Sequence, residues 1–271
     1  RQAILQAIRG LGGVGKTELA VQYVLGYGRL YPAGVFFLSA DAATELELLK
    51  RLAMAVHIVC EPDADADAMR RSVHHWFDTH EGWLLIVDNA DDADALKPSG
   101  ALSKALPPAT ALGHVLITSR VGTEAFGSLG IEAPLTLGLL DTNAAELLLL
   151  RVAFALDDAA ASARLQSLSS EERAAVTWLA GDQGLGRLPL AIVQAGSAIC
   201  EERYTFAGFR NEFERRRSML FEDAEATGTR REDQSVHTTW DISVEALRSK
   251  APAAAELLAL CSLLAPDGIP L

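Results

Sequence analysis

With 271 residues and 49% hydrophobic side chains, the chain can bury more than one core, which excludes a chain that is disordered as a whole. Its net charge of −12 excludes a broad basic face, so we expect neither an acidic membrane surface nor nucleic acid as a general partner. The three cysteines lie far apart without a C-x-x-C spacing, which argues against a structural zinc site.

Apolar segments of strand length alternate with helical patterns up to about residue 140. Strands are predicted at residues 3–9, 35–39, 83–88, 114–119 and 134–137, and helices at 16–30, 44–59 and 67–79. Continuous apolar strands separated by helices are typical of the α/β class, a parallel sheet sandwiched between helices. Because ligands bind such sheets beyond the carboxyl ends of the strands, we expect the functional residues there.

The first strand leads directly into a phosphate-binding motif. Residues 10–17, GLGGVGKT, match the P-loop pattern G-x-x-x-x-G-K-[ST] and precede a helix. This arrangement points backbone N–H groups and a helix N-terminus at an anion. Lys16 is expected to reach the β- and γ-phosphates of a nucleotide, and Thr17 to offer its hydroxyl to Mg²⁺. The candidate nucleotide-binding residues here are Gly10, Gly12, Gly13, Val14, Gly15, Lys16, Thr17 and Glu18.

The third strand ends in a carboxylate, Asp88, which gives it the Walker B form. An aspartate at this place can hold Mg²⁺ opposite the Thr17 hydroxyl. The next residue is Asn89, where many P-loop ATPases have a second acid that activates water, and asparagine cannot take a proton. Asp91 and Asp92 follow on the turn, where they can face solvent. The site is therefore expected to bind nucleotide with Mg²⁺ and to be poorly equipped to cleave it.

The fourth strand ends in Arg120. If this strand lies between the P-loop strand and the Asp88 strand, the guanidinium reaches the position of the γ-phosphate and can bond it bidentately. The alternative is an ordinary surface arginine after a strand. With Lys16 and Asp88, Arg120 completes the set of candidate catalytic residues.

Strand signals stop after residue 141, and helices follow one another. Ser169 and Glu172 resemble a capping box, and Phe206, Phe209 and Phe213 form an apolar stripe that we expect to pack in a core. The polar residues 222–235 are expected to form an exposed linker. The predicted helices span residues 143–156, 174–180, 188–201, 236–247 and 252–264. Pro189 lies in the first turn of one of them, where it begins the helix and, with Leu188, can also pack against an adenine edge.

These motifs, in this order, resemble the NB-ARC class of STAND ATPases (AP-ATPases, NLR-like), which includes plant disease-resistance and apoptosome proteins. The similarity rests on residues 10–17, 85–92, 116–120 and 188–191, the last of which is similar to the family motif G-L-P-L-A, with Arg187 in place of the glycine. It implies a P-loop nucleotide-binding domain at 1–140, a helical (ARC1-like) domain at 141–225, and the truncated beginning of a winged-helix (ARC2-like) domain at 236–271. The segments 88–92 and 239–270 are similar to the members that carry tetratricopeptide repeats, which are common in filamentous fungi and some bacteria.

The resemblance implies a molecular switch in signal transduction, in innate immunity or programmed cell death. ADP would hold the closed form, and exchange for ATP, sensed at Arg120, would favour an open form that assembles into a homo-oligomer, with slow ATP hydrolysis. The implied cofactors are ADP or ATP with Mg²⁺ held at Thr17 and Asp88. Effector and repeat domains would lie outside this fragment, and the expected location is the cytoplasm. The alternatives are a turnover ATPase of AAA+ or kinase-like type, which Asn89 disfavours, and a nucleotide-regulated DNA-binding regulator, which the acidic charge disfavours.

Overall fold

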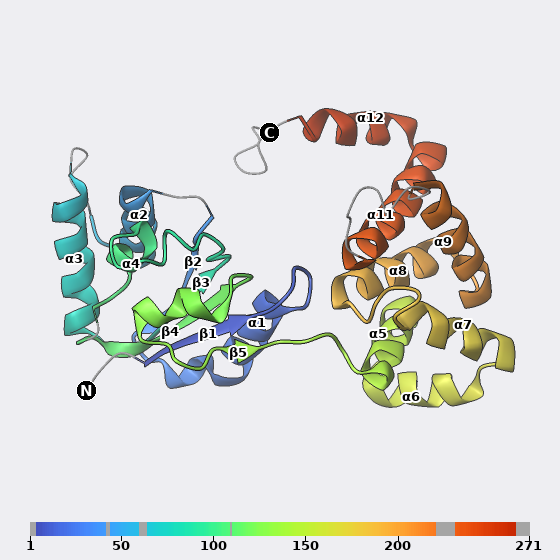
Figure 1. The fold of residues 1–271 in the computed structure, drawn as a ribbon, viewed down its shortest axis with the longest axis horizontal. Helices are drawn as coiled ribbons and strands as arrows, with labels where there is room; N and C mark the ends of the chain where they lie inside the picture. The colour runs from blue at the N-terminus through green and yellow to red at the C-terminus, as the bar shows by residue number, and fades with distance from the viewer. Residues whose placement is uncertain (1–3, 42–43, 60–63, 109, 221–230, 264–271) are drawn as a thin grey trace. The chain divides into compact units, whose positions relative to one another are not determined.

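The predicted strands form a five-stranded parallel sheet in the computed structural model, which describes residues 4–41, 44–59, 64–108, 110–220 and 231–263 (Figure 1). The strands are β1 (Ile4–Arg9), β2 (Gly34–Ser39), β3 (Glu81–Asp88), β4 (Leu112–Ser119) and β5 (Leu135–Thr136). Their order in the sheet is β2-β3-β4-β1-β5, and all the pairs are parallel. Strand β4 therefore lies between β1 and β3, which is the condition that the interpretation of Arg120 required.

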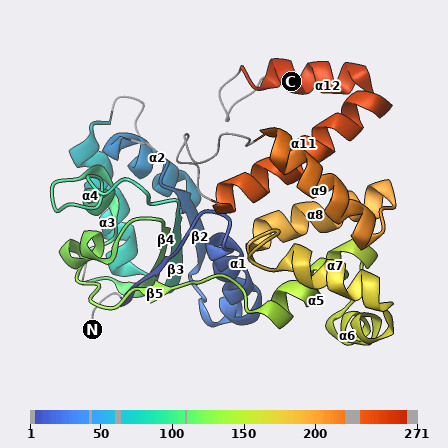
Figure 2. The same cartoon turned by 45° about the vertical axis from the view of Figure 1, so that its right-hand side comes forward.

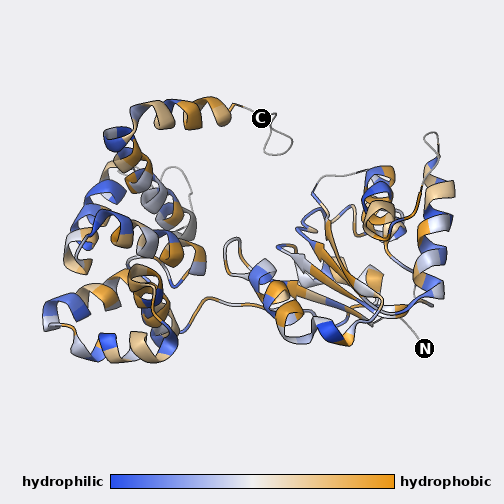
Figure 3. Cartoon of the chain, turned by 180° about the vertical axis from the view of Figure 1, so that it is seen from behind, coloured by the Kyte–Doolittle hydropathy of each residue, from blue (hydrophilic) through white to orange (hydrophobic). Residues whose placement is uncertain are grey.

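Helices cover both faces of this sheet, as predicted (Figure 2). Alternate side chains of β3 point to the two faces of the sheet. Leu85 and Val87 lie in one core with α2 (Glu45–Ala55), α3 (Ala66–Thr79) and α4 (Ala101–Ala105). Leu84 and Ile86 lie in the other, with α1 (Lys16–Tyr27). With both faces covered, the strands are mainly hydrophobic along their whole length (Figure 3). The α/β prediction for this part of the chain is confirmed.

Two short elements of the first unit were not predicted from the sequence. These are α4 and the 3-10 segment η2 (Thr123–Leu129). The predicted helix 16–30 ends early, because Gly28–Leu30 forms a 3-10 turn (η1). Within the described part of the chain, no helix is both long and apolar enough to cross a membrane.

The chain divides into two compact units, Arg1–Gly138 and Leu139–Leu271. The second is a helical bundle, as predicted, in which α8 packs against α5 and α11. The apolar stripe Phe206, Phe209 and Phe213 is buried in its core, which confirms the expected packing role. The helices of the bundle are α5 (Thr142–Phe154), α6 (Asp158–Ser167), α7 (Ser170–Ala180), α8 (Pro189–Glu202), α9 (Phe206–Leu220), α11 (Arg231–Lys250) and α12 (Pro252–Cys261).

The predicted linker at 222–235 is wrong over its last residues. Residues 222–230 lie outside the described residues, but α11 already begins at Arg231, and Ser235 is only 1% exposed. Buried polar side chains are satisfied here, because the Thr239 hydroxyl donates to Gln194 Oε1 at 2.9 Å and the Thr238 hydroxyl to the Gln234 carbonyl at 2.7 Å. A polar composition therefore did not indicate exposure in this segment.

The predicted capping box of α7 forms only in part. The Ser169 hydroxyl accepts a hydrogen bond from the Glu172 N–H at 3.3 Å, but the Glu172 carboxylate does not return to Ser169. It accepts instead from the N–H groups of Phe206 and Ala207, at 2.8 and 3.2 Å. Glu172 thus caps a different helix, α9, whose free N–H groups attract a carboxylate.

Replacing Glu172 by alanine is expected to destabilise the second unit by about 1–2 kcal/mol, because two N–H groups of α9 lose a charged acceptor. Amide hydrogen exchange should accelerate at Phe206 and Ala207, which NMR can follow residue by residue. The matched control is Glu171→Ala, an exposed glutamate on the same turn. Equal effects of the two substitutions would contradict the capping role.

Candidate nucleotide-binding site

The glycine-rich loop joins β1 to α1 and bends there for two different reasons. Gly13 and Gly15 adopt left-handed backbones with φ of 73° and 99°, which residues with a β-carbon rarely take. Gly10 instead provides space, because a β-carbon at this position would lie 2.5 Å from the Leu137 carbonyl oxygen. Helix α1 begins directly behind Gly15, which has no side chain to cap it. The helix N-terminus is thereby left to interact with an anion.

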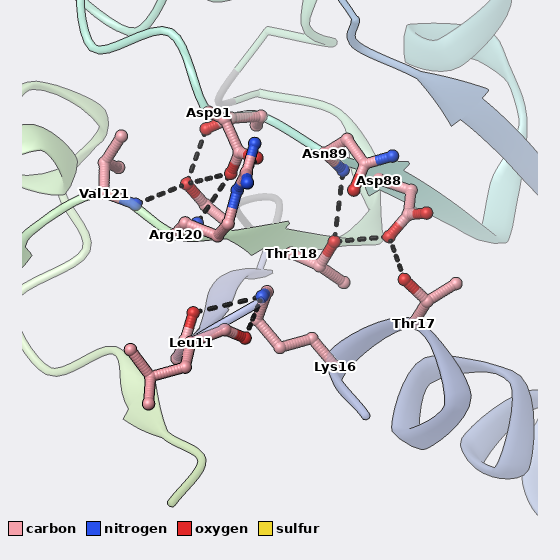
Figure 4. Close-up of polar contacts among 12 residues, drawn as sticks. Leu11, Lys16, Thr17, Asp88, Asn89, Asp91, Thr118, Arg120 and Val121 are labelled. Atoms are coloured by element: carbon pink, nitrogen blue, oxygen red, sulfur yellow. Dashed lines mark hydrogen bonds and ion pairs between the residues drawn. The ribbon is translucent and has the colours of Figure 1, made fainter. Parts of the chain in front are cut away.

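Lys16 closes the loop from inside. Its ammonium donates to the carbonyl oxygens of Gly10 and Leu11 at 3.0 and 2.9 Å, and the residue is only 8% exposed (Figure 4). Burial lowers the pKa of Lys16, the carboxylates of Asp91 and Asp88 act to raise it, and the nearby guanidinium of Arg120 acts to lower it. The lysine is therefore surrounded by the other charged groups of the site.

Thr17, Asp88 and Thr118 form a chain of hydrogen bonds at the carboxyl ends of the strands. The Thr17 hydroxyl donates to Asp88 Oδ1 at 2.8 Å, and the fully buried Thr118 hydroxyl donates to the same oxygen. Thr118 Oγ1 also accepts from the Asn89 N–H at 3.2 Å. Both bonds to the carboxylate use Oδ1, so the second oxygen has no hydrogen bond from any residue that the structure describes. Thr118 was not predicted as a site residue; the signal that marks it is its place two residues before Arg120 on a strand that pairs with β3.

Arg120 forms an ion pair with Asp91, one of the two carboxylates on the turn that could have faced solvent. Arg120 Nε lies 2.5 Å from Asp91 Oδ2, and the Arg120 backbone N–H donates to Asp91 Oδ1 at 2.6 Å. The Asp91 side chain is only 22% exposed, so of these two carboxylates only that of Asp92 faces solvent. The Ala90 N–H donates to the Thr118 carbonyl at 3.0 Å, which holds the backbone after β3 beside the end of β4 and brings the Asp91 carboxylate to Arg120. No local sequence pattern indicates this contact.

The other candidate residues of the first unit have unequal access to a ligand. Val14 is buried against Gly10, and the exposed Glu18 carboxylate accepts from Gln22 Nε2 at 2.7 Å. Any contact of these two residues with phosphate would therefore come from their backbone N–H groups. Gly12 lies next to the Arg120 side chain, since a β-carbon at Gly12 would be 3.9 Å from Arg120 Cδ.

The chain is similar in sequence to a known protein. Over 97% of its length, the chain is 28% identical to a nucleotide-binding leucine-rich repeat (NLR)-like protein of Hyaloscypha variabilis. The chain spans only 27% of that protein. Among solved structures, a chain of Drosophila ORC bound to DNA matches 98% of this chain, which spans 64% of it, with a TM-score of 0.41 and 14% identity. No family model matches the chain.

Leu188 and Pro189 belong to the second unit, at the start of α8. Leu188 is the buried N-cap residue, and Pro189 is half-buried in the first turn. Arg187, which stands where the similar motif has glycine, adopts a left-handed backbone with φ of 56°. Its Nε lies 2.8 Å from an Asp182 carboxylate oxygen. Arg187 therefore adopts the left-handed backbone that a glycine would favour at this turn, and its side chain forms an ion pair with Asp182.

The donor set at the carboxyl ends of the strands fits Mg²⁺. Mg²⁺ prefers oxygen ligands, and Thr17 Oγ1 and the Asp88 carboxylate supply them side by side. Over the described ranges, no cluster of three or more His, Cys, Asp or Glu residues could hold a metal by itself. A Mg²⁺ ion at this place would therefore take its remaining ligands from water and nucleotide phosphates.

Proposed function

We propose that this chain is the nucleotide-binding switch module of a STAND (NB-ARC) signalling protein, with ADP as its resting ligand. The observation that carries the proposal is the 2.8 Å bond between Thr17, directly behind the glycine loop, and Asp88 at the end of β3. This bond joins the predicted phosphate loop to the predicted metal-binding carboxylate. The similarity to an NLR-like protein over nearly the whole chain supports the same function.

In this proposal the chain binds the nucleotide mainly through its polyphosphate. The loop N–H groups and the N-terminus of α1 hold the β-phosphate, and Lys16 exchanges its two carbonyl partners for phosphate oxygens. Thr17 and Asp88 hold Mg²⁺, which when bound neutralises part of the phosphate charge. Leu188 and Pro189 contact the adenine.

ATP hydrolysis is expected to be slow. Asn89 occupies the position after Asp88 and cannot accept a proton from water. Its backbone is left-handed, with φ of 58°, a conformation that asparagine tolerates better than most residues. We expect steady-state phosphate release below about one per second, the lower end of ordinary enzyme turnover. Faster release would favour a turnover ATPase.

The remaining parts of the proposal concern the whole protein. The ARC1-like domain would span residues 141–225, and the ARC2-like winged helix would begin at 236. ATP exchange would favour an open, homo-oligomeric form in the cytoplasm, coupled to effector and tetratricopeptide-repeat domains in immunity or cell death. The match to one quarter of an NLR-like protein supports a module of this kind within a longer chain.

The direct test is calorimetry with ADP on the full chain, after removal of any nucleotide that is retained on purification. We expect ADP to bind with one site per chain and to bind more tightly with Mg²⁺ than with EDTA. The retained nucleotide, identified by chromatography, should be ADP. Absence of ADP binding in both conditions would contradict the proposal.

Replacing Arg120 by alanine is expected to weaken the binding of ATP more than the binding of ADP, since the guanidinium would contact only the γ-phosphate. Loss of one or two charged hydrogen bonds, at about 1.5–3 kcal/mol each, should lower the affinity for a non-hydrolysable ATP analogue at least tenfold. Titration calorimetry of both nucleotides measures the ratio. Equal losses for the two nucleotides would remove the sensing role.

A further inference from the structure

The ion pair between Asp91 and Arg120 uses the guanidinium in an unsymmetrical way. Asp91 Oδ2 accepts a hydrogen bond from the innermost guanidinium nitrogen, Nε, and Asp91 Oδ1 accepts one from the backbone N–H of Arg120 (Figure 4). The other two nitrogens, Nη1 and Nη2, have no acceptor among the residues that the structure describes. One carboxylate thus fixes the arginine at its backbone and at the base of its guanidinium.

The free end of this guanidinium lies in the environment of the phosphate loop. Arg120 Cδ passes 3.9 Å from where a β-carbon of Gly12 would lie, and the Arg120 charge acts on Lys16. Nη1 and Nη2 form the end-on fork that bonds two phosphate oxygens. Because Asp91 occupies Nε, this fork remains complete.

We propose that Asp91 is a positioning residue that holds Arg120 ready for the terminal phosphate of ATP. The inference rests on the proposed function, because it assigns to Asp91 a part in the discrimination between ATP and ADP. Asp91 does not itself touch the nucleotide. It acts through the arginine.

The energetic reason is the mobility of an exposed arginine. The Arg120 side chain is 64% exposed, and immobilising such a side chain on binding costs conformational entropy. Two bonds to one half-buried carboxylate remove much of this cost before the nucleotide arrives. The carboxylate also carries a negative charge, but the adjacent guanidinium balances it, so repulsion of the phosphate is small.

The test compares Asp91→Asn with wild type in the full chain, using calorimetry with Mg²⁺ and either ADP or a non-hydrolysable ATP analogue. We expect the ratio of the ATP-analogue affinity to the ADP affinity to fall about three- to tenfold. In the Arg120→Ala background the same substitution should leave the ratio unchanged, because the residue on which Asp91 acts is absent. The matched control is Asp94→Asn, which removes an equal charge from an exposed ion pair with Lys97 and should leave the ratio unchanged.

A second measurement needs no nucleotide. In the ligand-free chain, the ¹H–¹⁵N signal of Arg120 Nε, assigned by its loss in Arg120→Ala, should be protected from exchange in wild type and unprotected in Asp91→Asn. Equal protection in both chains would overturn the inference, as would an affinity ratio that Asp91→Asn leaves unchanged or increases relative to wild type. Failure of the wild-type chain to bind either nucleotide would overturn the proposed function as well, so the two failures are distinguishable.

Discussion

Replacement of Lys16 by alanine is expected to lower the affinity for ADP at least about a hundredfold. The ammonium is the only side-chain cation proposed to contact the β-phosphate, and two charged hydrogen bonds contribute about 1.5–3 kcal/mol each. The substitution also removes the donor that joins the carbonyl groups of Gly10 and Leu11, so the loop loses its closure. Titration calorimetry with ADP and Mg²⁺ measures the effect.

The control for this experiment is Lys97→Ala, the same substitution at an exposed lysine of the same unit. It should leave ADP affinity unchanged. Thermal unfolding of Lys16→Ala checks that the variant is folded at the temperature of the titration. Unchanged ADP affinity in a folded Lys16→Ala chain would refute the site.

Replacement of Asp88 by alanine is expected to abolish the gain in ADP affinity that Mg²⁺ gives the wild-type chain. Asp88 supplies the only carboxylate proposed to hold the ion. Removing even an outer partner of a metal site costs roughly tenfold or more in metal affinity, so a direct ligand should cost at least that. The measurement is ADP affinity with Mg²⁺ and with EDTA, compared between the two chains.

The matched control is Asp92→Ala, four residues along the same segment and exposed. It should keep the full Mg²⁺ gain. Because Asp88→Ala leaves the buried hydroxyl of Thr118 without its acceptor, the variant should also unfold at a lower temperature. A chain that lacks Asp88 but keeps the Mg²⁺ gain would place the metal ion elsewhere.

Much of the first unit could be predicted because its signals are local. Each strand is a continuous apolar run, and the loop sequence fixes where β1 ends and α1 begins. Strand order is not local, so the sequence could state only conditionally that β4 lies between β1 and β3. The proximity of Thr118 to Asp88 depends on that order, and it was missed for this reason.

The incorrect predictions share a physical cause, which is polar side chains that find partners far along the chain. Glu172 has the spacing of a capping box, but its carboxylate bonds α9, more than thirty residues later. Asp91 follows a strand on what looks like an open turn, yet it pairs with Arg120. Sequence spacing indicates which bonds a side chain can make nearby, and tertiary structure decides among them.

Asn89 places an uncharged side chain between the carboxylates of Asp88 and Asp91, on a left-handed backbone. Asparagine and aspartate both tolerate this conformation, so the backbone alone does not require an amide here. An aspartate would, however, place a third carboxylate between Asp88 and Asp91, and their mutual repulsion would oppose both the folded turn and an incoming anion. The neutral amide keeps the negative charge density at this edge of the sheet low, which under the proposed function would favour binding of a polyphosphate.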